Sequence, residues 1–387
     1  MPVIDVLVVG GGPAGVACAL ALHARGLRVV LAERWPWGPP GLPGETLPGR
    51  ARLALEALGV ADILDDRSCT PIRAQRSRWG SAVRERSLMQ DPYGHGWHID
   101  RARFDQRLRS RAAELGVDVR LGMRCTSVSA EAASWRVTLD QDRGRSSLRA
   151  SFVVDATGRT AFVARALGAR RARCDRSVAL VAEIPGGPGC GAVDGTTLVE
   201  VCPAGWWYAV ASAAQGIALT FISDTALIPT MASDRLAALR DHVRTAPLIA
   251  RFVAGARGPS CLRVVSAAPG AISPMTGDGW LATGDAMAVH DPLVFSGITK
   301  ALEHGRVSAA AVAACLGGDL AALDRLRAQG QAELRAHLQM RRAYHAVTGL
   351  TRYRFWRERA CPPVQPAPAL PVQPVDWAPA AAMAAFA

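Results

Sequence analysis

The chain has 387 residues, half of them hydrophobic, which suits two or three globular domains and excludes a disordered or fibrous protein. Its nine cysteines include no CxxC pair, so neither a disulfide framework nor a metal site is expected. The same cysteine usage leads us to expect a cytoplasmic location. The formal net charge is +12 and all but one of the 45 basic residues are arginine, which favours an anionic cofactor or an acidic partner. No signal peptide is expected before the first strand.

A glycine-rich turn follows the first expected strand, residues 4–9, and opens an alanine-rich helix at 13–24. A second strand, 27–32, ends at Glu33. This is the setting of a dinucleotide-binding fingerprint, in which glycines permit a tight turn and close approach to a pyrophosphate, while the acid accepts from a ribose hydroxyl. The cofactor-binding residues predicted here are Gly10, Gly12, Pro13, Ala14, Gly15, Glu33 and Arg34.

The next stretch has a Pro/Gly/Trp-rich loop at 34–44, and the run Gly44-Glu45-Thr46-Leu47-Pro48 is expected to open a helix to about residue 58. Asp100 is a suitable N-cap for a helix at 101–115. Arg101 lies in its first turn, where a cation opposes the helix dipole, so a cofactor pyrophosphate would relieve the conflict; a solvated arginine is the alternative. Glu45 and Thr46 are expected either to line a flavin or to cap a helix.

Strands are expected at 75–88, 117–120, 126–128, 135–139 and 148–154, and they lead into Asp155-Ala156-Thr157-Gly158-Arg159. Cys125, Asp155 and Gly158 are further cofactor-binding candidates. Residues 205–222 carry no charge, but a turn signal at Gln215-Gly216 favours a buried hairpin over a membrane span.

A late run, Thr283-Gly284-Asp285-Ala286, ends a strand and offers a carboxylate for the ribityl hydroxyls of FAD. The segment 291–298 then turns into a helix whose N-terminal amides would face the flavin and stabilise negative charge on its reduced ring. An ordinary strand-turn-helix with a capping aspartate is the alternative. The candidates here are Gly284, Asp285, Pro292, Gly297 and Ile298.

Catalytic candidates are few. His98 and His290 are the histidines nearest in sequence to these motifs, and either could donate a proton beside the flavin, although a structural histidine is the commoner case. Trp207 lies on an expected strand where one face could wall a pocket; core packing is the competing interpretation.

Together, GGGPAG, Glu33, GETLP, DATGR and GDA…DP…GI resemble the para-hydroxybenzoate-hydroxylase-type FAD proteins. That group includes monooxygenases, halogenases and geranylgeranyl reductases, and the resemblance covers roughly residues 1–360. The runs at 78–81, 93–101 and 205–208 look most like the flavoproteins that mature tryptophylquinone cofactors. One departure is Leu293-Val294-Phe295-Ser296, where such proteins usually have small polar residues.

The resemblance implies a monooxygenase with non-covalent FAD, NAD(P)H as transient reductant and O₂, hydroxylating a peptide- or protein-bound tryptophan. Halogenases of this group need a lysine after the GE motif, and residues 45–100 contain none, so halogenation is not expected. A small-molecule aromatic hydroxylase, a geranylgeranyl-reductase-like enzyme and a flavin-bound assembly partner without catalysis stay open.

The sequence thus predicts an α/β protein: a Rossmann-like FAD-binding domain with an inserted antiparallel-sheet substrate domain and a helical C-terminal region. The expected boundaries are 1–172, with part of the substrate sheet at about 75–98, then 173–266, 267–318, 319–361 and a Pro/Ala-rich tail at 362–387. Residues 341–359 mix arginines with aromatic residues. They are expected to bind an acidic peptide or protein, or else to form a solvated helix face; nucleic acid is not favoured.

Overall fold

A computed structural model describes residues 3–36, 45–66, 68–141, 144–185, 195–212, 216–229, 231–294 and 296–360. These residues form two compact units. The first contains Met1–Ile72, Asp91–Ser177 and Ser266–His337, and the second contains Arg73–Gln90, Val178–Val265 and the described residues from Leu338 on. The tail expected at 362–387 and most of the loop expected at 34–44 lie outside the described residues.

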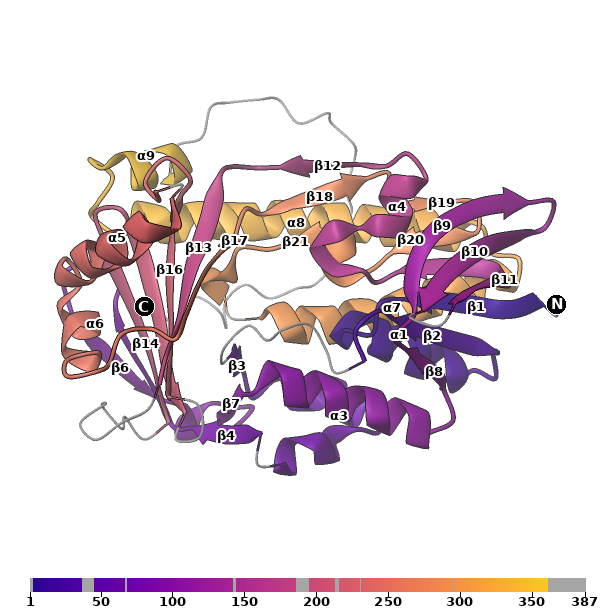
Figure 1. Cartoon of the computed structure of the whole chain (residues 1–387), viewed down its shortest axis with the longest axis horizontal. Helices are drawn as coiled ribbons and strands as arrows, with labels where there is room; N and C mark the ends of the chain where they lie inside the picture. Colours follow the sequence, from indigo (N-terminus) through magenta and orange to yellow (C-terminus); the bar gives the residue numbers. More distant parts are fainter. Residues whose placement is uncertain are drawn as a thin grey trace. The chain divides into compact units, whose positions relative to one another are not determined.

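A largely parallel sheet forms the centre of the first unit (Figure 1), with its strands in the order β19-β20-β11-β1-β2-β8. Leu7 and Val8 are both fully buried although they point to opposite faces of β1, because a parallel sheet is covered on both sides. The strands expected at 4–9, 27–32, 117–120 and 148–154 are confirmed. The bounds are β1 Val3–Val9, β2 Val29–Glu33, β8 Asp118–Leu121, β11 Gly144–Asp155, β19 Thr276–Gly277 and β20 Trp280–Ala282.

An antiparallel meander and two small sheets complete the β-structure of this unit. The meander, β9 Arg124–Glu131 and β10 Ser134–Gln141, pairs with β11 and is longer than the sequence predicts. The small sheets have the orders β3-β7-β4 and β12-β18-β21. Their bounds are β3 Glu45–Leu47, β4 Cys69–Ile72, β7 Gly96–Ile99, β12 Arg170–Arg173, β18 Gly270–Ser273 and β21 Ala288–Val289.

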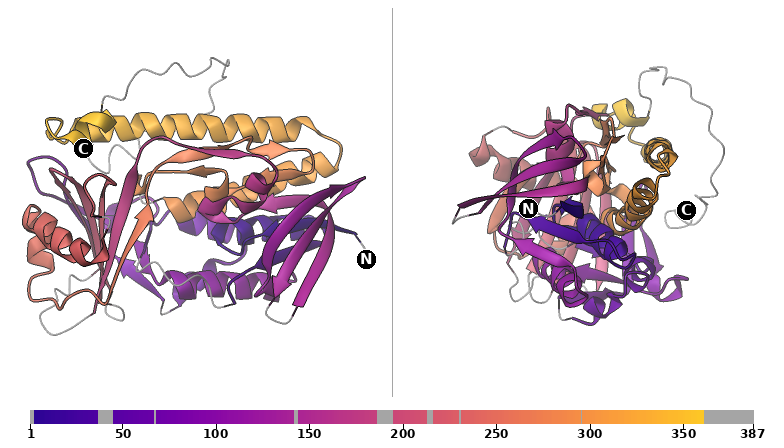
Figure 2. Two further views of the ribbon diagram at one scale, coloured as in Figure 1. Left: turned by 45° about the horizontal axis from the view of Figure 1, so that its top comes forward. Right: turned by 90° about the vertical axis from the view of Figure 1, so that its right-hand side faces the viewer.

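The helices of the first unit cover the parallel sheet. α1 packs against α7 in both views of Figure 2, and the contact is close because a Cβ on Gly305 of α7 would lie 2.7 Å from Ala17 Cβ of α1. Asp100 caps α3 as predicted, accepting from the backbone N–H groups of Ala102 and Arg103. The bounds are α1 Pro13–His23, α2 Ala51–Glu56, α3 Arg101–Glu114, α4 Phe162–Ala166, α7 Gly297–Leu316 and α8 Ala321–Ala346, the last turns of α8 belonging to the second unit.

The helix start predicted at 44–48 is wrong. Glu45 to Leu47 form strand β3, whose Thr46 is paired with His98 of β7, and the helix begins only at Ala51. The local sequence favours a helix after Pro48. The residues before Pro48 instead pair with β7, about fifty residues later in the chain, and so form a strand. Likewise β7 pairs within the first unit, so the inserted sheet takes only β5 and β6 from the region around 75–98.

A mainly antiparallel sheet of order β17-β13-β16-β15-β14-β5-β6 forms the second unit. The hairpin expected within 205–222 is confirmed as β15 and β16. One face buries apolar side chains such as Leu180 and Leu219 against α5 and α6. The bounds are β5 Ala74–Arg78, β6 Arg84–Ser87, β13 Ser177–Ile184, β14 Thr196–Cys202, β15 Gly205–Ser212, β16 Gly216–Asp224, β17 Cys261–Ser266, α5 Ala232–Arg244, α6 Pro247–Phe252 and α9 Arg354–Ala360.

Three of the aromatic residues of the C-terminal segment, Tyr344, Phe355 and Trp356, are core residues. Trp79 meets Trp206, Tyr344 and Trp356 edge-on, with ring centroids 6.0, 6.5 and 5.7 Å away. Phe355 and Trp356 are almost fully buried, and Trp356 Nε1 donates to the Cys202 carbonyl at 2.8 Å. The expectation that aromatic residues of this segment form a binding surface is therefore wrong for Tyr344, Phe355 and Trp356, which pack inside the second unit.

No helix among the described residues is long and apolar enough to cross a membrane.

Candidate functional site

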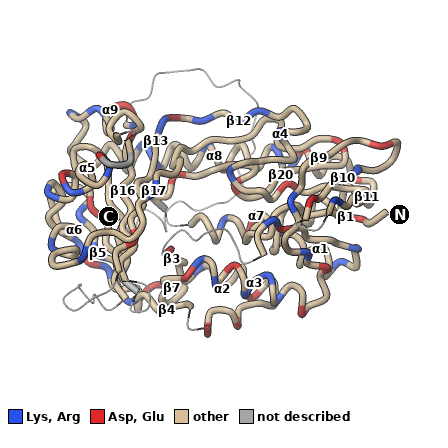
Figure 3. Tube along the Cα trace, in the orientation of Figure 1, with Lys and Arg blue, Asp and Glu red and all other residues tan. Residues whose placement is uncertain are grey.

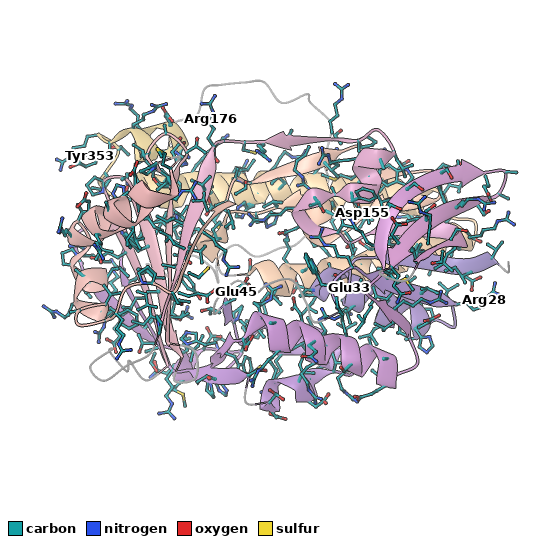
Figure 4. The ribbon with its side chains drawn as sticks, in the orientation of Figure 1. Arg28, Glu33, Glu45, Asp155, Arg176 and Tyr353 are labelled. Atoms are coloured by element: carbon teal, nitrogen blue, oxygen red, sulfur yellow. The ribbon has the colours of Figure 1, made fainter. Side chains whose placement is uncertain are left out.

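Four strand ends meet at one edge of the parallel sheet. Val9 of β1 is in register with Ala32 of β2 and with Asp155 of β11, and Asp155 is in register with Ala282 of β20. Figure 4 labels Glu33 and Asp155, the last residues of their strands. Motifs separated by more than two hundred residues are thereby brought to one edge, where ligands of parallel sheets bind.

The glycines of the turn after β1 leave no room for side chains inside the protein. Gly10 has φ +111°, and a Cβ on it would collide with the carbonyl oxygen of Ala156. A Cβ on Gly15 would collide with the carbonyl oxygen of Gly10. Gly12 differs, because a Cβ there meets no atom within 4 Å. The N-terminus of α1, which Pro13 and Ala14 begin, therefore faces open space that a phosphate group fits.

Glu33 holds the turn itself. Its carboxylate accepts from the Gly11 N–H at 2.6 Å and from the Trp35 N–H at 2.8 Å. A carboxylate has further lone pairs, so a ribose hydroxyl remains compatible with this arrangement. Arg34 is exposed, with its guanidinium 5.2 Å from the centroid of the Trp35 ring.

Arg101 has carboxylate partners of its own. Its guanidinium donates to Glu45 at 2.7 Å and to Asp105 at 3.0 Å. Burial lowers the pKa of Arg101, but Asp105 and Glu45 outweigh it and hold that pKa above its ordinary value. The dipole conflict of a cation in the first turn is thus relieved by two protein acids, so it no longer requires an anionic ligand.

Asp155 anchors the loop after β11. One carboxylate oxygen accepts from the backbone and hydroxyl of Thr157, and the other accepts from the Ala164 N–H at 2.8 Å. Burial raises its pKa. Gly158 begins the following turn with φ +65°. Cys125 is buried on β9, and burial raises the pKa of its thiol to about 12, so it stays protonated near neutral pH.

The late Gly284-Asp285 turn contacts the first motif. Gly284 has φ +59°, and a Cβ on it would lie 2.6 Å from Ala14 Cβ. Asp285 accepts from Lys300 Nζ at 3.1 Å and lies 3.5 Å from Arg159 Nε. Burial would raise the pKa of Asp285, but Lys300 and Arg159 hold it below its ordinary value. Asp285 is therefore an anion at neutral pH, as a hydroxyl acceptor should be.

Sequence reasoning missed Arg171. Its Nη2 donates to the carbonyl oxygens of Asp285 and Ala286, both at 2.8 Å, and so fixes the turn. Residue 171 lies in an arginine-rich run without any recognisable motif, so only the fold reveals this role.

The segment before α7 is held by its own polar groups. Asp291 accepts from the Leu293 N–H at 3.0 Å, and the Asp291 N–H donates to His337 Nε2 at 2.8 Å. Pro292 is half-buried and Ile298 is buried, whereas Gly297 is exposed and a Cβ on it would meet nothing within 4 Å. The N-terminus of α7, like that of α1, thus opens onto unfilled space.

The three catalytic candidates lie in different surroundings. His290 stacks on His337, with centroids 4.3 Å apart, and its Nε2 is buried without a hydrogen-bond partner among the described residues. Burial and the nearby Lys300 lower the pKa of His290, so the ring is neutral. His98 is buried on β7, opposite Thr46 and Thr70.

Trp207 belongs to the core of the second unit. It is fully buried and stacks on Phe221, with ring centroids 4.4 Å apart. This is the core packing that the sequence left as the alternative, and the geometry gives no support to a pocket-wall role.

Comparison with known proteins indicates which ligand this site binds. Residues 3–185 match the family model described as the FAD binding domain. The chain is 27% identical over 303 residues to a protein of Marinomonas mediterranea named, provisionally, as the FAD-dependent oxidoreductase LodB, covering 77% of this chain and 81% of that one. The structure is similar to the myxobacterial chondrochloren halogenase CndH, with TM-score 0.82 and 25% identity over 93% of this chain and 86% of that one. It is also similar to the peptidyl tryptophan dihydroxylase QhpG, with TM-score 0.77 and 22% identity over 95% and 81% of the two chains.

The glycine turn after β1 lies within residues 3–185, so this part of the chain is an FAD-binding domain. Over most of its length the chain has the same fold as CndH and QhpG.

Replacing Gly297 by valine is expected to leave the fold intact and alter the flavin. The new side chain would occupy the open space at the N-terminus of α7 and keep a ligand away from its backbone amides. Less negative charge would then be stabilised on the reduced ring, so the reduction potential should fall. Dye-equilibration measurements of the potential test this, with Gly258→Val as control because its Cβ also meets nothing. An unchanged potential in Gly297→Val would remove the assignment.

Proposed function

We propose that this protein is an FAD-dependent monooxygenase that hydroxylates a tryptophan held in a peptide or protein, as a step in making a quinone cofactor. NAD(P)H and O₂ are its co-substrates: one oxygen atom enters the aromatic ring, and the other leaves as water with the electrons of NAD(P)H. The observation that carries the proposal is that a Cβ on Gly12 or on Gly297 would meet no atom, which leaves the N-termini of α1 and α7 open to a cofactor. The similarity to QhpG supports the tryptophan substrate.

FAD, when bound, would supply the redox chemistry with O₂. The residues proposed to hold it are Gly10, Gly12 and Gly15 for the pyrophosphate, Asp285 for the ribityl chain and Gly297 with Ile298 for the ring. The protein's remaining tasks are to orient the aromatic ring and to exclude water.

His290 is the histidine that we propose for proton transfer. Its Nε2 has no hydrogen-bond partner among the described residues, and stacking on His337 fixes the ring. Burial and the nearby Lys300 disfavour the protonated imidazole, so His290 would pass a proton on to another acceptor and would not retain it. His98 is a second candidate on weaker grounds, since it lies in the centre of a small sheet.

An acidic partner is proposed for the exposed arginines of the C-terminal segment, which Figure 3 colours blue around α9. The exposed members are Arg342, Arg352, Arg354 and Arg357. Arg354 is already paired with Glu358 at 2.7 Å, whereas Arg341 and Arg359 are buried and unavailable. Arg342, Arg352 and Arg357 are thus left to attract acidic residues of a partner.

Halogenation is the second candidate, favoured by the similarity to CndH. Against it stands the single lysine of the chain, Lys300, whose Nζ is engaged with Asp285 at 3.1 Å and with the Ala288 carbonyl at 2.5 Å. A lysine tied to the cofactor turn in this way is a poor carrier for an oxidised halogen.

The proposal predicts oxygen gain on a partner protein. The chain is incubated with FAD, NADH or NADPH, ¹⁸O₂, bromide and proteins encoded beside it, and intact masses are recorded. We expect one or two ¹⁸O atoms on a tryptophan of one partner and no bromine. Bromine on the product would establish the halogenase, and turnover of a free aromatic compound with no protein modified would move the enzyme to the small-molecule hydroxylases.

The same assay tests the partner surface. Arg352→Glu with Arg357→Glu should abolish the modification without changing FAD content, because the reversed charges repel an acidic partner. The matched control is Arg240→Glu with Arg251→Glu, which reverses two exposed arginines on α5 and α6. Equal loss in both double variants would mean that net charge, and not this surface, governs association.

A further inference from the structure

Arg109 is a buried cation beside the glycine turn. It lies on α3 and is only 3% exposed. Its Nη1 donates to the carbonyl oxygen of Gly11 at 3.3 Å, and a Cβ on Gly11 would lie 3.0 Å from Arg109 Cδ. The side chain therefore contacts the turn whose open side faces the cofactor space.

Two nitrogens of Arg109 have no hydrogen-bond partner in the described part of the chain. Nε and Nη2 are buried and make no hydrogen bond to any described residue. An unsatisfied polar group in a protein interior costs about 1–3 kcal/mol, and a charged one costs more. Native structures rarely keep such a group unless a ligand or water satisfies it.

The other arginines of α3 differ from Arg109 in having acidic partners. Each of the other arginines of α3 has a carboxylate within ion-pair distance: Arg101 with Glu45 and Asp105, Arg103 with Asp100, Arg107 with Asp66, and Arg111 with Asp62 and Glu114. Among the described residues Arg109 has no such partner. The most deeply buried arginine of α3 is thus the one that still needs an anion.

The Gly11 peptide is held from both sides. Glu33 accepts its N–H and Arg109 donates to its carbonyl oxygen. The two side chains hold the turn in place, and Arg109 adds positive charge next to the residue that precedes the open position Gly12. A diphosphate carries both the charge and the oxygen acceptors that the free N–H groups require.

We infer that Arg109 binds the diphosphate of FAD through Nε and Nη2. The sequence suggested Arg101 for this role, but Arg101 is paired with Glu45 and Asp105. The inference concerns the cofactor and holds for any substrate of the enzyme.

The test is calorimetric titration of the flavin-free full-length protein with FAD, ADP and adenosine. Charge-assisted hydrogen bonds contribute about 1.5–3 kcal/mol. Arg109→Gln should therefore weaken FAD and ADP binding by about ten- to hundredfold and leave adenosine binding within about twofold. The matched control is Arg103→Gln, which removes an arginine 69% exposed from the same helix and should bind all three ligands normally.

Three results would overturn the inference. ADP affinity of Arg109→Gln equal to that of Arg103→Gln would show that the guanidinium does not contact the phosphates. An equal loss for adenosine and ADP would mean that Arg109 only braces the Gly11 turn. Should Arg109→Gln fail to fold, Arg109→Lys keeps a cation in place, and it must then bind ADP more weakly than wild type but adenosine equally well; equal ADP affinity would exclude the two-nitrogen contact.

Discussion

Gly12→Ala is expected to give a folded protein that has lost most of its affinity for FAD. Gly12 precedes α1 with φ −76° and ψ 178°, an extended conformation that alanine adopts freely. Its Cβ would meet no protein atom within 4 Å, so the methyl group enters only the space assigned to the pyrophosphate. Overpacking of this kind costs about 1–3 kcal/mol, or roughly ten- to hundredfold in affinity. Fluorescence titration with FAD measures the loss.

Comparison among glycines makes this experiment specific. Gly258→Ala also adds a methyl group that meets no protein atom, but in the second unit, and should retain FAD. Gly15→Ala should damage the fold itself, because its Cβ collides with the Gly10 carbonyl. Thermal unfolding of the flavin-free proteins separates the cases. Normal FAD affinity in Gly12→Ala would place the cofactor elsewhere.

Breaking the ion pair between Asp224 and Arg359 should destabilise the second unit strongly. The two side chains are 11% and 2% exposed, and Arg359 Nη2 lies 2.9 Å from Asp224 Oδ2. Removing either partner takes this ion pair away from a buried charge, and breaking a buried pair typically costs about 3–5 kcal/mol. Arg359→Met and Asp224→Asn are both expected to unfold at lower denaturant concentration than wild type, as followed by tryptophan fluorescence.

The double variant is the informative control. The double variant Arg359→Met with Asp224→Asn loses the same ion pair only once, so it should be less destabilised than the sum of the two single variants. The exposed pair Arg354–Glu358, one turn away on the same helix, should contribute no more than about 1 kcal/mol. Strict additivity at Asp224 and Arg359 would mean that the two charges do not stabilise each other.

Local patterns in the sequence predicted the strand edge well. The turn after β1, the acid ending β2 and the late GDA run each carry their signal within a few residues, and parallel register then brings them together. The partners of Arg101 could not be predicted in this way. Glu45 is 56 residues distant, and a helical cation looks the same in sequence whether a ligand or a remote acid neutralises it.

The sequence could not predict which face of the sheet Trp207 would occupy. Alternation separates Trp206 from Trp207 but does not tell which face the helices α5 and α6 will cover. In the structure Trp207 meets Phe221, whereas Trp206 meets Trp79. Arg109 escaped notice for a related reason: in a chain so rich in arginine, only burial distinguishes it from its exposed neighbours.

The contacts of α9 affect how the second unit folds during translation. Trp356 donates to the Cys202 carbonyl and Arg359 pairs with Asp224, each joining residues more than 130 positions apart. During synthesis, the inserted sheet therefore leaves the ribosome long before the helix that completes it. Until α9 arrives, the Trp79 and Trp206 rings lack the Trp356 contact and Asp224 lacks its guanidinium. The nascent second unit would thus expose apolar surface from the completion of its sheet until α9 is made, a state in which chaperones commonly hold a chain.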